Sequence, residues 1–278
     1  MRMSRRLALY AVGGGLSETG FSFDGGEDSY TFVQDGKDWM LTIKGTGLLT
    51  FNKPVEVEVF LVGGGGGGSL QGGGGGGGYT LTQRGVSLLK GEPYSIEIGS
   101  GGAGAAKQGG TGDPTSAFGF TANGGLGGKG ADFSYSSRTG GDGGSGGGGG
   151  DWVDGNSAEN LGRGGSDGSD GYEGRKATGG KGQGPTTRAF GEKTGELFAG
   201  GGCCSGLKVL VKPIDVDGEG SGNGGGGSGG SKRNGETQAT TSGTPNTGGG
   251  GGSDYYDREY IGSGGCGVVI IRNAREVA

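Results

Sequence analysis

Two uninterrupted glycine runs constrain this chain more than any other feature. Residues 63–68 and 72–78 are all glycine, only Ser69, Leu70 and Gln71 separate them, and a β-like segment adjoins each outer end. Glycine accounts for 83 of the 278 residues and proline for 6, so the tracts form either a low-complexity linker or a structure that glycine itself builds. Collagen is excluded, because it needs a strict Gly-X-Y repeat and abundant proline.

Short β-like segments lie between the glycine tracts along the whole chain. They contain many β-branched and aromatic residues, as in VEVEVFLV at 55–62 and GVVIIRNA at 267–274, and nothing has helical periodicity. With 28% apolar residues the hydrophobic core must be small, and we expect Trp39 to belong to it. A disordered linker would not be interleaved with one small sheet at so many places.

The order of segments and tracts predicts repeated excursions from a common sheet. Each tract leaves a β-like segment, reaches a short turn and is followed by a tract that returns, which gives about twelve tracts in about six round trips. In this scheme 140–150 is a single returning tract. The segments 151–161, which includes Trp152, and 231–247 lie on the side of the sheet.

Extended polyglycine II helices are the conformation that suits such tracts. They have three residues per turn and about 3.1 Å rise, and their outward N–H and C=O groups must be satisfied by neighbouring helices. Only glycine lets backbones approach on several sides at once. The all-glycine tracts 63–68 and 72–78 are therefore predicted to be central, and 162–171, with side chains at period three, to lie at the surface.

We accordingly expect a fold that is mainly β plus polyglycine II. A small antiparallel β-sandwich base, resembling a jelly roll, would carry a bundle of about twelve antiparallel polyglycine II helices, with essentially no α-helix. Residues 16–278 form one glycine-rich domain, and residues 1–15 form an N-terminal attachment arm or a frayed terminus.

Composition excludes most catalytic chemistry. The chain has no histidine, and its three cysteines lack metal-ligand spacing, so we expect no enzyme, metal or cofactor and interpret the cysteines as apolar fillers, with a disulfide left open. The glycine tracts match phosphate-loop patterns only trivially. A carbohydrate-cleaving site built from two carboxylates stays an alternative. The candidate pairs are Asp151 with Asp154, Asp167 with Asp170, and Asp254 with Asp257.

Charge and hydropathy also limit the partners. The net charge is −5 and the basic residues are scattered, so nucleic acid is not an expected partner. No apolar run is long enough to insert into a membrane, and the apolar stretch 7–12 is shorter than that of a signal peptide. We expect synthesis in the cytoplasm.

Six segments, in this order, resemble the glycine-rich domain proteins of phage tails and prophages. The architecture is similar to the polyglycine sandwich adhesins that cap the tail fibres of some T-even-like phages, and more remotely to the secreted, disulfide-bearing glycine-rich domain of anaplastic lymphoma kinase receptors. The segments are LLTFNKPVEVEVFLVGGGGGGS, GGGGGGGYT, YSIEIGSGGAG, TSAFGFTANGG, TTRAFGEKTGELFAGGG and GVVIIRNAR, within about 30–275.

The resemblance implies a virion protein that recognises the host at the tip of a tail fibre or spike. It offers no motif for individual binding residues. Its partners would be a host polysaccharide or protein and, through residues 1–15, a fibre or tail shaft. The oligomeric state is open, with a trimer among the candidates. A purely structural virion decoration protein is the first alternative, and the carbohydrate-cleaving spike is the second.

The expected binding surface consists of the turns far from the sheet, which are 69–71, 105–108, 131–139, 172–178, 207–217 and 253–261. Tracts of seven residues span about 20 Å and can place these turns on one distal surface. Tyrosine and arginine are enriched at binding hot spots, although aromatic rings could instead cap the open ends of the rods. The candidate receptor-binding residues are Phe133, Tyr135, Arg138, Tyr172, Arg175, Lys176, Lys208, Tyr255, Tyr256 and Tyr260.

Overall fold

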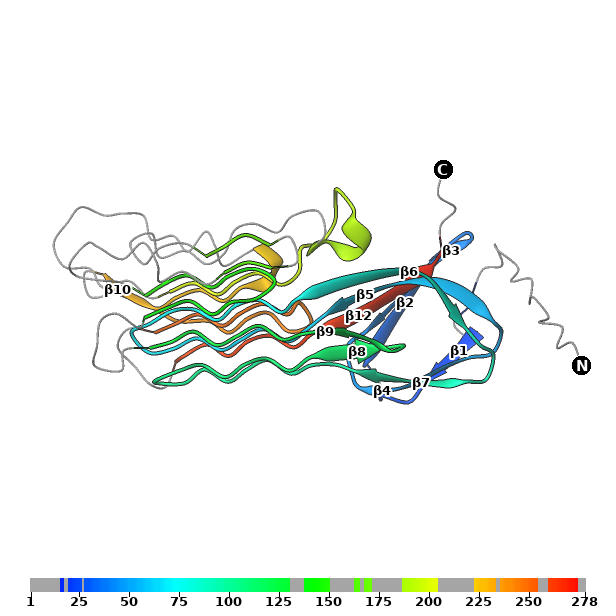
Figure 1. The fold of residues 1–278 in the computed structure, drawn as a ribbon, viewed down its shortest axis with the longest axis horizontal. Helices are drawn as coiled ribbons and strands as arrows, with labels where there is room; N and C mark the ends of the chain where they lie inside the picture. Colours follow the sequence, from blue (N-terminus) through cyan, green and yellow to red (C-terminus); the bar gives the residue numbers. More distant parts are fainter. Residues whose placement is uncertain are drawn as a thin grey trace, which may run out of the picture.

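The computed structural model shows an elongated molecule with two parts. Figure 1 shows β-sheets at one end, here called the base, and a bundle of extended glycine-rich rods that project away from them. We call the far end of the bundle the distal end. The structure describes residues 16–17, 20–26, 28–130, 138–150, 163–165, 168–171, 187–204, 223–233, 236–254 and 260–274.

The base consists of two five-stranded antiparallel sheets. The first has the strand order β1-β4-β7-β8-β9, and the second has the order β2-β3-β12-β5-β6. The first sheet contains β1 (Phe21–Phe23), β4 (Gly47–Phe51), β7 (Pro93–Glu97), β8 (Thr115–Ala117) and β9 (Phe120–Ala122). The second contains β2 (Tyr30–Asp35), β3 (Asp38–Ile43), β5 (Val55–Val62), β6 (Thr80–Leu88) and β12 (Val268–Asn273).

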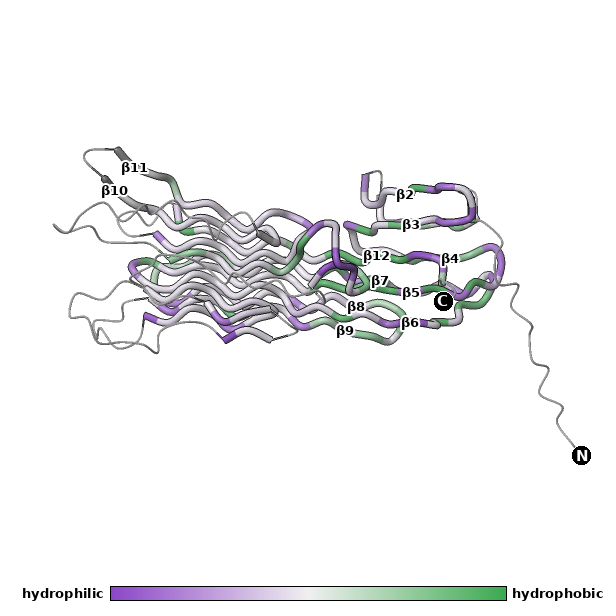
Figure 2. Tube along the Cα trace, turned by 90° about the horizontal axis from the view of Figure 1, so that it is seen from above, coloured by the Kyte–Doolittle hydropathy of each residue, from purple (hydrophilic) through white to green (hydrophobic). Residues whose placement is uncertain are grey.

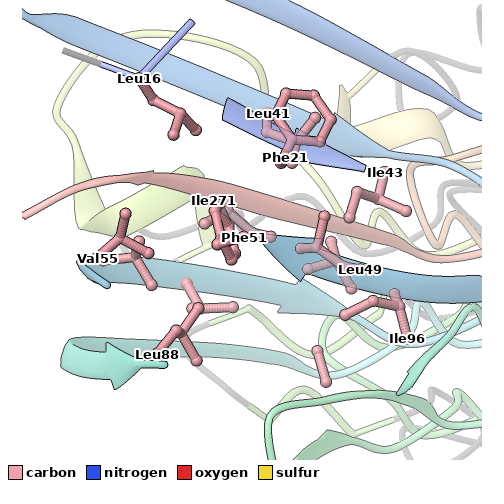
Figure 3. Packing of buried hydrophobic residues seen from close by; sticks show 14 of the residues in the cluster. Leu16, Phe21, Leu41, Ile43, Leu49, Phe51, Val55, Leu88, Ile96 and Ile271 are labelled. Atoms are coloured by element: carbon pink, nitrogen blue, oxygen red, sulfur yellow. The ribbon is translucent and has the colours of Figure 1, made fainter. Parts of the chain in front are cut away.

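The hydrophobic core lies between these two sheets. Leu49 and Phe51 from β4 and Ile96 from β7 face Leu41 from β3 and Ile271 from β12, and all five are fully buried (Figure 3). Alternating positions on each strand supply this core, as expected for sheets with one buried face. Trp39 is 4% exposed and packs in the same cluster, which confirms its predicted place.

The outer face of the second sheet is partly covered by residues 187–199. Phe198 packs against Phe60 with ring centroids 5.4 Å apart, and Phe190 packs on the same ring at 6.2 Å. This cover explains why the second half of β5 is apolar at every position, since Phe60 and Val62 are buried although they point away from the main core.

A partly buried ionic network holds the same covering segment. The Glu58 carboxylate, on β5, accepts hydrogen bonds from Arg84 and from Arg272, and Glu192 of the covering segment accepts a second bond from Arg272. The Arg272 guanidinium also lies 3.9 Å from the centroid of the Phe190 ring. Glu58 and Arg272 are nearly buried, so both incur a desolvation penalty, which their ion pair and hydrogen bonds offset. The Arg84 and Glu192 side chains are partly exposed.

The rods run between the base and the distal end in both directions (Figures 1 and 2). Their directions follow from the hydrogen bonds that join them. The outward rods are 63–68, 99–104, 124–130, 145–150, 168–171, 200–204, 224–230 and 248–254. The returning rods in the described part of the chain are 72–78, 109–113, 138–143, 239–245 and 260–267.

Rods 63–68 and 72–78, which we call the central pair, are completely buried. The amides of Gly63 and Gly66 donate to rod 72–78 and to Tyr79 at its end, those of Gly64 and Gly67 donate to rod 109–113, and those of Gly65 and Gly68 donate to rod 260–267. Three further rods, 99–104, 124–130 and 248–254, donate to carbonyl groups of the same rod. Rod 63–68 is thus hydrogen-bonded to six neighbours.

Several predictions about the fold are confirmed. The protein is mainly β, and the described residues contain no α-helix, only the short 3-10 turns η4 (Ala189–Gly191) and η5 (Asn223–Gly225). The two all-glycine tracts are the innermost rods, and the described part of 162–171 lies at the surface. None of the three cysteines forms a disulfide, and Cys203 and Cys204 are buried as small fillers.

The prediction of a single returning tract at 140–150 is wrong. The chain turns at Gly143, Gly144 and Ser145, next to the base, and runs outward again, so that Ser145 accepts from Gly77 and Gly148 accepts from Gly74. Gly150 therefore lies at the distal end, bonded to Arg138, and the segment that begins at 151 follows a distal rod end. Trp152 itself lies outside the described residues.

The placement of 231–247 at the base is also wrong. Gly230 donates to Ser253 near the distal end, and strands β10 (Ser231–Arg233) and β11 (Glu236–Gln238) form a hairpin there (Figure 1). Residues 239–245 then return along the bundle, and only the turn around Thr247 lies at the base. The hairpin consists of polar residues, so its composition did not distinguish a distal turn from a basal one.

Candidate functional site

The distal turns that the structure describes converge on one another. The central turn 69–71 makes parallel bridges through Ser69 to Ala105 and through Leu70 to Asp254. The Gln71 amide also donates to the carbonyl oxygen of Asp254 at 2.6 Å. The turn 69–71 therefore meets the turn 105–108 and the distal end of rod 248–254, as the sequence predicted.

Backbone hydrogen bonds hold these turns in place. Ser69 is fully buried, and its hydroxyl donates to the carbonyl oxygen of Gly73 at 2.9 Å. Gly130 donates to the carbonyl oxygen of Lys107, which joins the turn 105–108 to the end of the neighbouring rod. Loops fixed to a rigid scaffold lose little conformational entropy when they bind a partner.

Two of the predicted receptor-binding residues lie in the described part of the chain. Tyr260 is 57% exposed at the distal start of rod 260–267. Arg138 is 8% exposed, and its main chain bonds to Gly150. The roles of both stay predictions. The other predicted residues lie outside the described residues: Phe133, Tyr135, Tyr172, Arg175, Lys176, Lys208, Tyr255 and Tyr256.

The structure adds polar residues at the distal end that sequence reasoning did not select. Lys107 and Gln108 are exposed in the turn 105–108, and Lys129 is exposed at the end of rod 124–130. Gln108 and Lys129 form an antiparallel bridge, so they are neighbours. The sequence did predict a distal position for the turn 105–108. Its lysine and glutamine were not selected as binding residues, because isolated residues of these types are common on any surface.

The candidate carboxylate pairs are only partly described. Asp170 accepts a hydrogen bond from the Gly164 amide and pairs with Arg163 at 3.3 Å, so this carboxylate fixes a turn of the backbone. Asp254 is 7% exposed at the bridge to Leu70. Asp151, Asp154, Asp167 and Asp257 lie outside the described residues.

Among the described residues, no group of three or more histidine, cysteine, aspartate or glutamate side chains is placed to hold a metal ion. In the same part of the chain, no helix has the length and apolar character needed to span a membrane.

Comparison with known protein families gives a match over most of the chain. The sequence model of a family described as a glycine-rich domain matches residues 42–274, which include most of the base and the whole bundle. No curated protein matches the sequence.

Proposed function

The chain belongs to the glycine-rich domain family, and we propose that it is a non-enzymatic receptor-binding adhesin at the tip of a phage tail fibre or spike. In this role the base attaches to the rest of the particle, and the distal turns contact the host. The observation that carries the proposal is the separation of the two ends of the molecule by a bundle of extended rods (Figure 1).

The first support is that both ends of the described chain lie in the base. Leu16 is buried in the core between the sheets, and Ala274 donates a backbone hydrogen bond to Glu56 on β5. Segments beyond these residues are thus attached at the end opposite the distal turns. This arrangement suits a protein that is held at the base and presents its turns outward.

The second support is the conformation that we propose for the rods, the polyglycine II helix. Successive amides of rod 63–68 donate to three different neighbours, and the same neighbour recurs every third residue. Three residues per turn is the period of that helix. Rods linked in this way on all sides are stiff, so they can hold the distal turns at a fixed distance from the base.

The location and the partners belong to the same proposal. The protein resides on a virion after synthesis in the host cytoplasm, contacts a polysaccharide or protein of the host surface, and docks on a fibre or tail shaft through residues 1–15. The resemblance to glycine-rich tail proteins supports these assignments. A trimeric assembly would present three distal surfaces together.

Binding of the purified full chain to bacterial cells tests the proposal. A labelled preparation is expected to bind some members of a panel of bacterial strains. Changing Tyr255, Tyr256 and Tyr260 together to alanine is expected to weaken that binding at least about tenfold, since hot-spot tyrosines each contribute about 1 kcal/mol or more.

A charge variant of the base is the control. Lys53→Gln changes a residue between β4 and β5, far from the distal end, and should leave cell binding unchanged. Absence of binding to any strain would favour a structural decoration protein. Release of reducing sugar from the cell surface polysaccharide would favour the carbohydrate-cleaving alternative.

A further inference from the structure

One side of the bundle is formed by three rods in a row, 109–113, 124–130 and 138–143. Gly112 donates to Gly125 across the first pair of rods, and Leu126 donates to Asp142 across the second. Rods 109–113 and 124–130 bond to central rod 63–68, and rods 124–130 and 138–143 bond to central rod 72–78. The three rods therefore lie side by side over the central pair.

Several non-glycine residues on or directly before these rods are spaced by three and are exposed or half-buried. Asn123, directly before rod 124–130, and Leu126 and Lys129, on it, are all exposed and are separated by pairs of glycine. Gln108 and Thr111 are exposed directly before and on rod 109–113, and Thr139 and Asp142 are half-buried on rod 138–143. We call these seven residues the side face.

The side face has an apolar centre with a polar surround. Leu126 is 46% exposed, and its backbone amide donates to the carbonyl oxygen of Asp142 on the neighbouring rod. One turn later, the backbone amide of Lys129 donates in the same way to Thr139. The surround offers hydroxyl, amide and ammonium groups, and therefore both donors and acceptors, while the Asp142 carboxylate already accepts a hydrogen bond from the Arg163 amide. One lysine and one aspartate leave it without net charge.

We propose that the side face binds a neutral linear polysaccharide whose chain lies along the rods. A sugar ring combines an apolar face of C–H groups with a rim of hydroxyl groups, which complements an exposed leucine surrounded by donors and acceptors. A face without net charge has no electrostatic preference for an anionic chain such as a nucleic acid or an acidic glycan.

The regularity of the rods favours a polymer over a single sugar. Equivalent positions recur every three residues, which is about 9 Å along a polyglycine II axis. Successive units of a linear chain can therefore meet Lys129, Leu126 and Asn123 in turn. Because the backbone of each rod is already fixed by its neighbours, binding costs little ordering entropy.

This inference extends the proposed adhesin by naming a receptor class, but it does not depend on the distal turns. Its test is calorimetric titration of the full chain with maltohexaose, cellohexaose and chitohexaose, with polygalacturonate as the acidic probe. At least one neutral hexasaccharide is expected to bind, and polygalacturonate is expected not to bind. Binding should change little with salt, since no charge is neutralised.

Variants locate the binding to the side face. Leu126→Ala is expected to weaken hexasaccharide binding about tenfold, equivalent to about 1.4 kcal/mol. Thr111→Ala combined with Gln108→Ala should weaken it further. Val33→Ala, at an exposed apolar position on β2 of the base, is the matched control and should leave it unchanged. Unchanged amide exchange in rods 63–68 and 72–78 would show that each variant is folded.

Three outcomes would overturn the inference. These are no binding of any neutral hexasaccharide, binding of polygalacturonate alone, and full binding by folded Leu126→Ala. None of them removes the adhesin proposal, which stands or falls on cell binding and on the distal tyrosines. Conversely, hexasaccharide binding by a protein that binds no cells would support the side face alone.

Discussion

The base and the bundle reach complete burial by different physical means. In the base, Leu49 and Phe51 are fully buried, and the removal of apolar surface from water stabilises the packing. In the bundle, Gly63 to Gly68 are buried as completely, but they have no side chains to pack, and backbone hydrogen bonds to six neighbouring rods are the main interaction. The difference shows that a buried interior does not require hydrophobic residues, provided that every buried backbone group finds a partner.

The two regions should also respond differently to substitution. A hydrophobic core tolerates changes of shape, because neighbouring side chains can adjust their rotamers. The glycine interior has no rotamers to adjust, and its nearest atoms are backbone carbonyl groups. Central rods should therefore be less tolerant than the core, and peripheral rods more tolerant than either.

The largest effect is expected for Gly65→Val in the central pair. A Cβ at this position would overlap the carbonyl oxygen of Gly249, which is backbone and cannot move away without breaking its own bonds. We expect a loss of more than about 5 kcal/mol of stability, or failure of the bundle to form. Denaturant unfolding and amide exchange of 63–68 measure it. A loss below about 1 kcal/mol would show that the rods separate easily, as a flexible linker would.

A smaller effect is expected for Phe51→Ala in the core of the base. The ring packs near Trp39, with 6.4 Å between centroids, and its removal leaves a cavity between the sheets. The expected cost is about 3–5 kcal/mol, measured by thermal unfolding with near-ultraviolet circular dichroism. Because β5 and β6 continue into the central pair, amide protection of 63–68 should be lost in the same transition. Persistent protection would mean that the bundle is stable without its base.

The smallest effect is expected for Ala103→Val on a peripheral rod. Ala103 occupies an exposed position on rod 99–104, so the added methyl groups should change stability by less than about 0.5 kcal/mol. Gly102→Val, at the adjacent residue, provides the matched comparison, because a Cβ at Gly102 would overlap the carbonyl oxygen of Gly110. Equal effects of Ala103→Val and Gly102→Val in denaturant unfolding would contradict the distinction between outward and inward positions.

The innermost rods were predictable, whereas the path of the chain between rods was only partly so. Tracts 63–68 and 72–78 contain no side chain on any face, and only the interior of a bundle imposes that requirement. The turn at Gly143, Gly144 and Ser145 escaped prediction because glycine can both continue and reverse a rod. A reversal inside a glycine run therefore changes the fold without a distinct sequence signal.

The candidate site, like the fold, was predictable only in part. The turns 69–71 and 105–108 were expected at the distal end, and the structure places them together. The side face was not predicted, although Asn123, Leu126 and Lys129 show period three in the sequence. Their period indicates an outward face on one rod, but it does not say which rods lie beside it.

The sequence by itself determined the two types of structural element in this protein. These are β segments that form a small core between sheets, and glycine runs whose lack of side chains permits close backbone packing. The tertiary structure alone decided which rod neighbours which, where hidden reversals occur, and which side chains gather on one face. The physical reason is that buried positions in the base can be recognised in the sequence by their hydrophobic side chains. The N–H and C=O groups that join the rods, in contrast, are the same at every residue. Their pairing is fixed only when the whole bundle assembles.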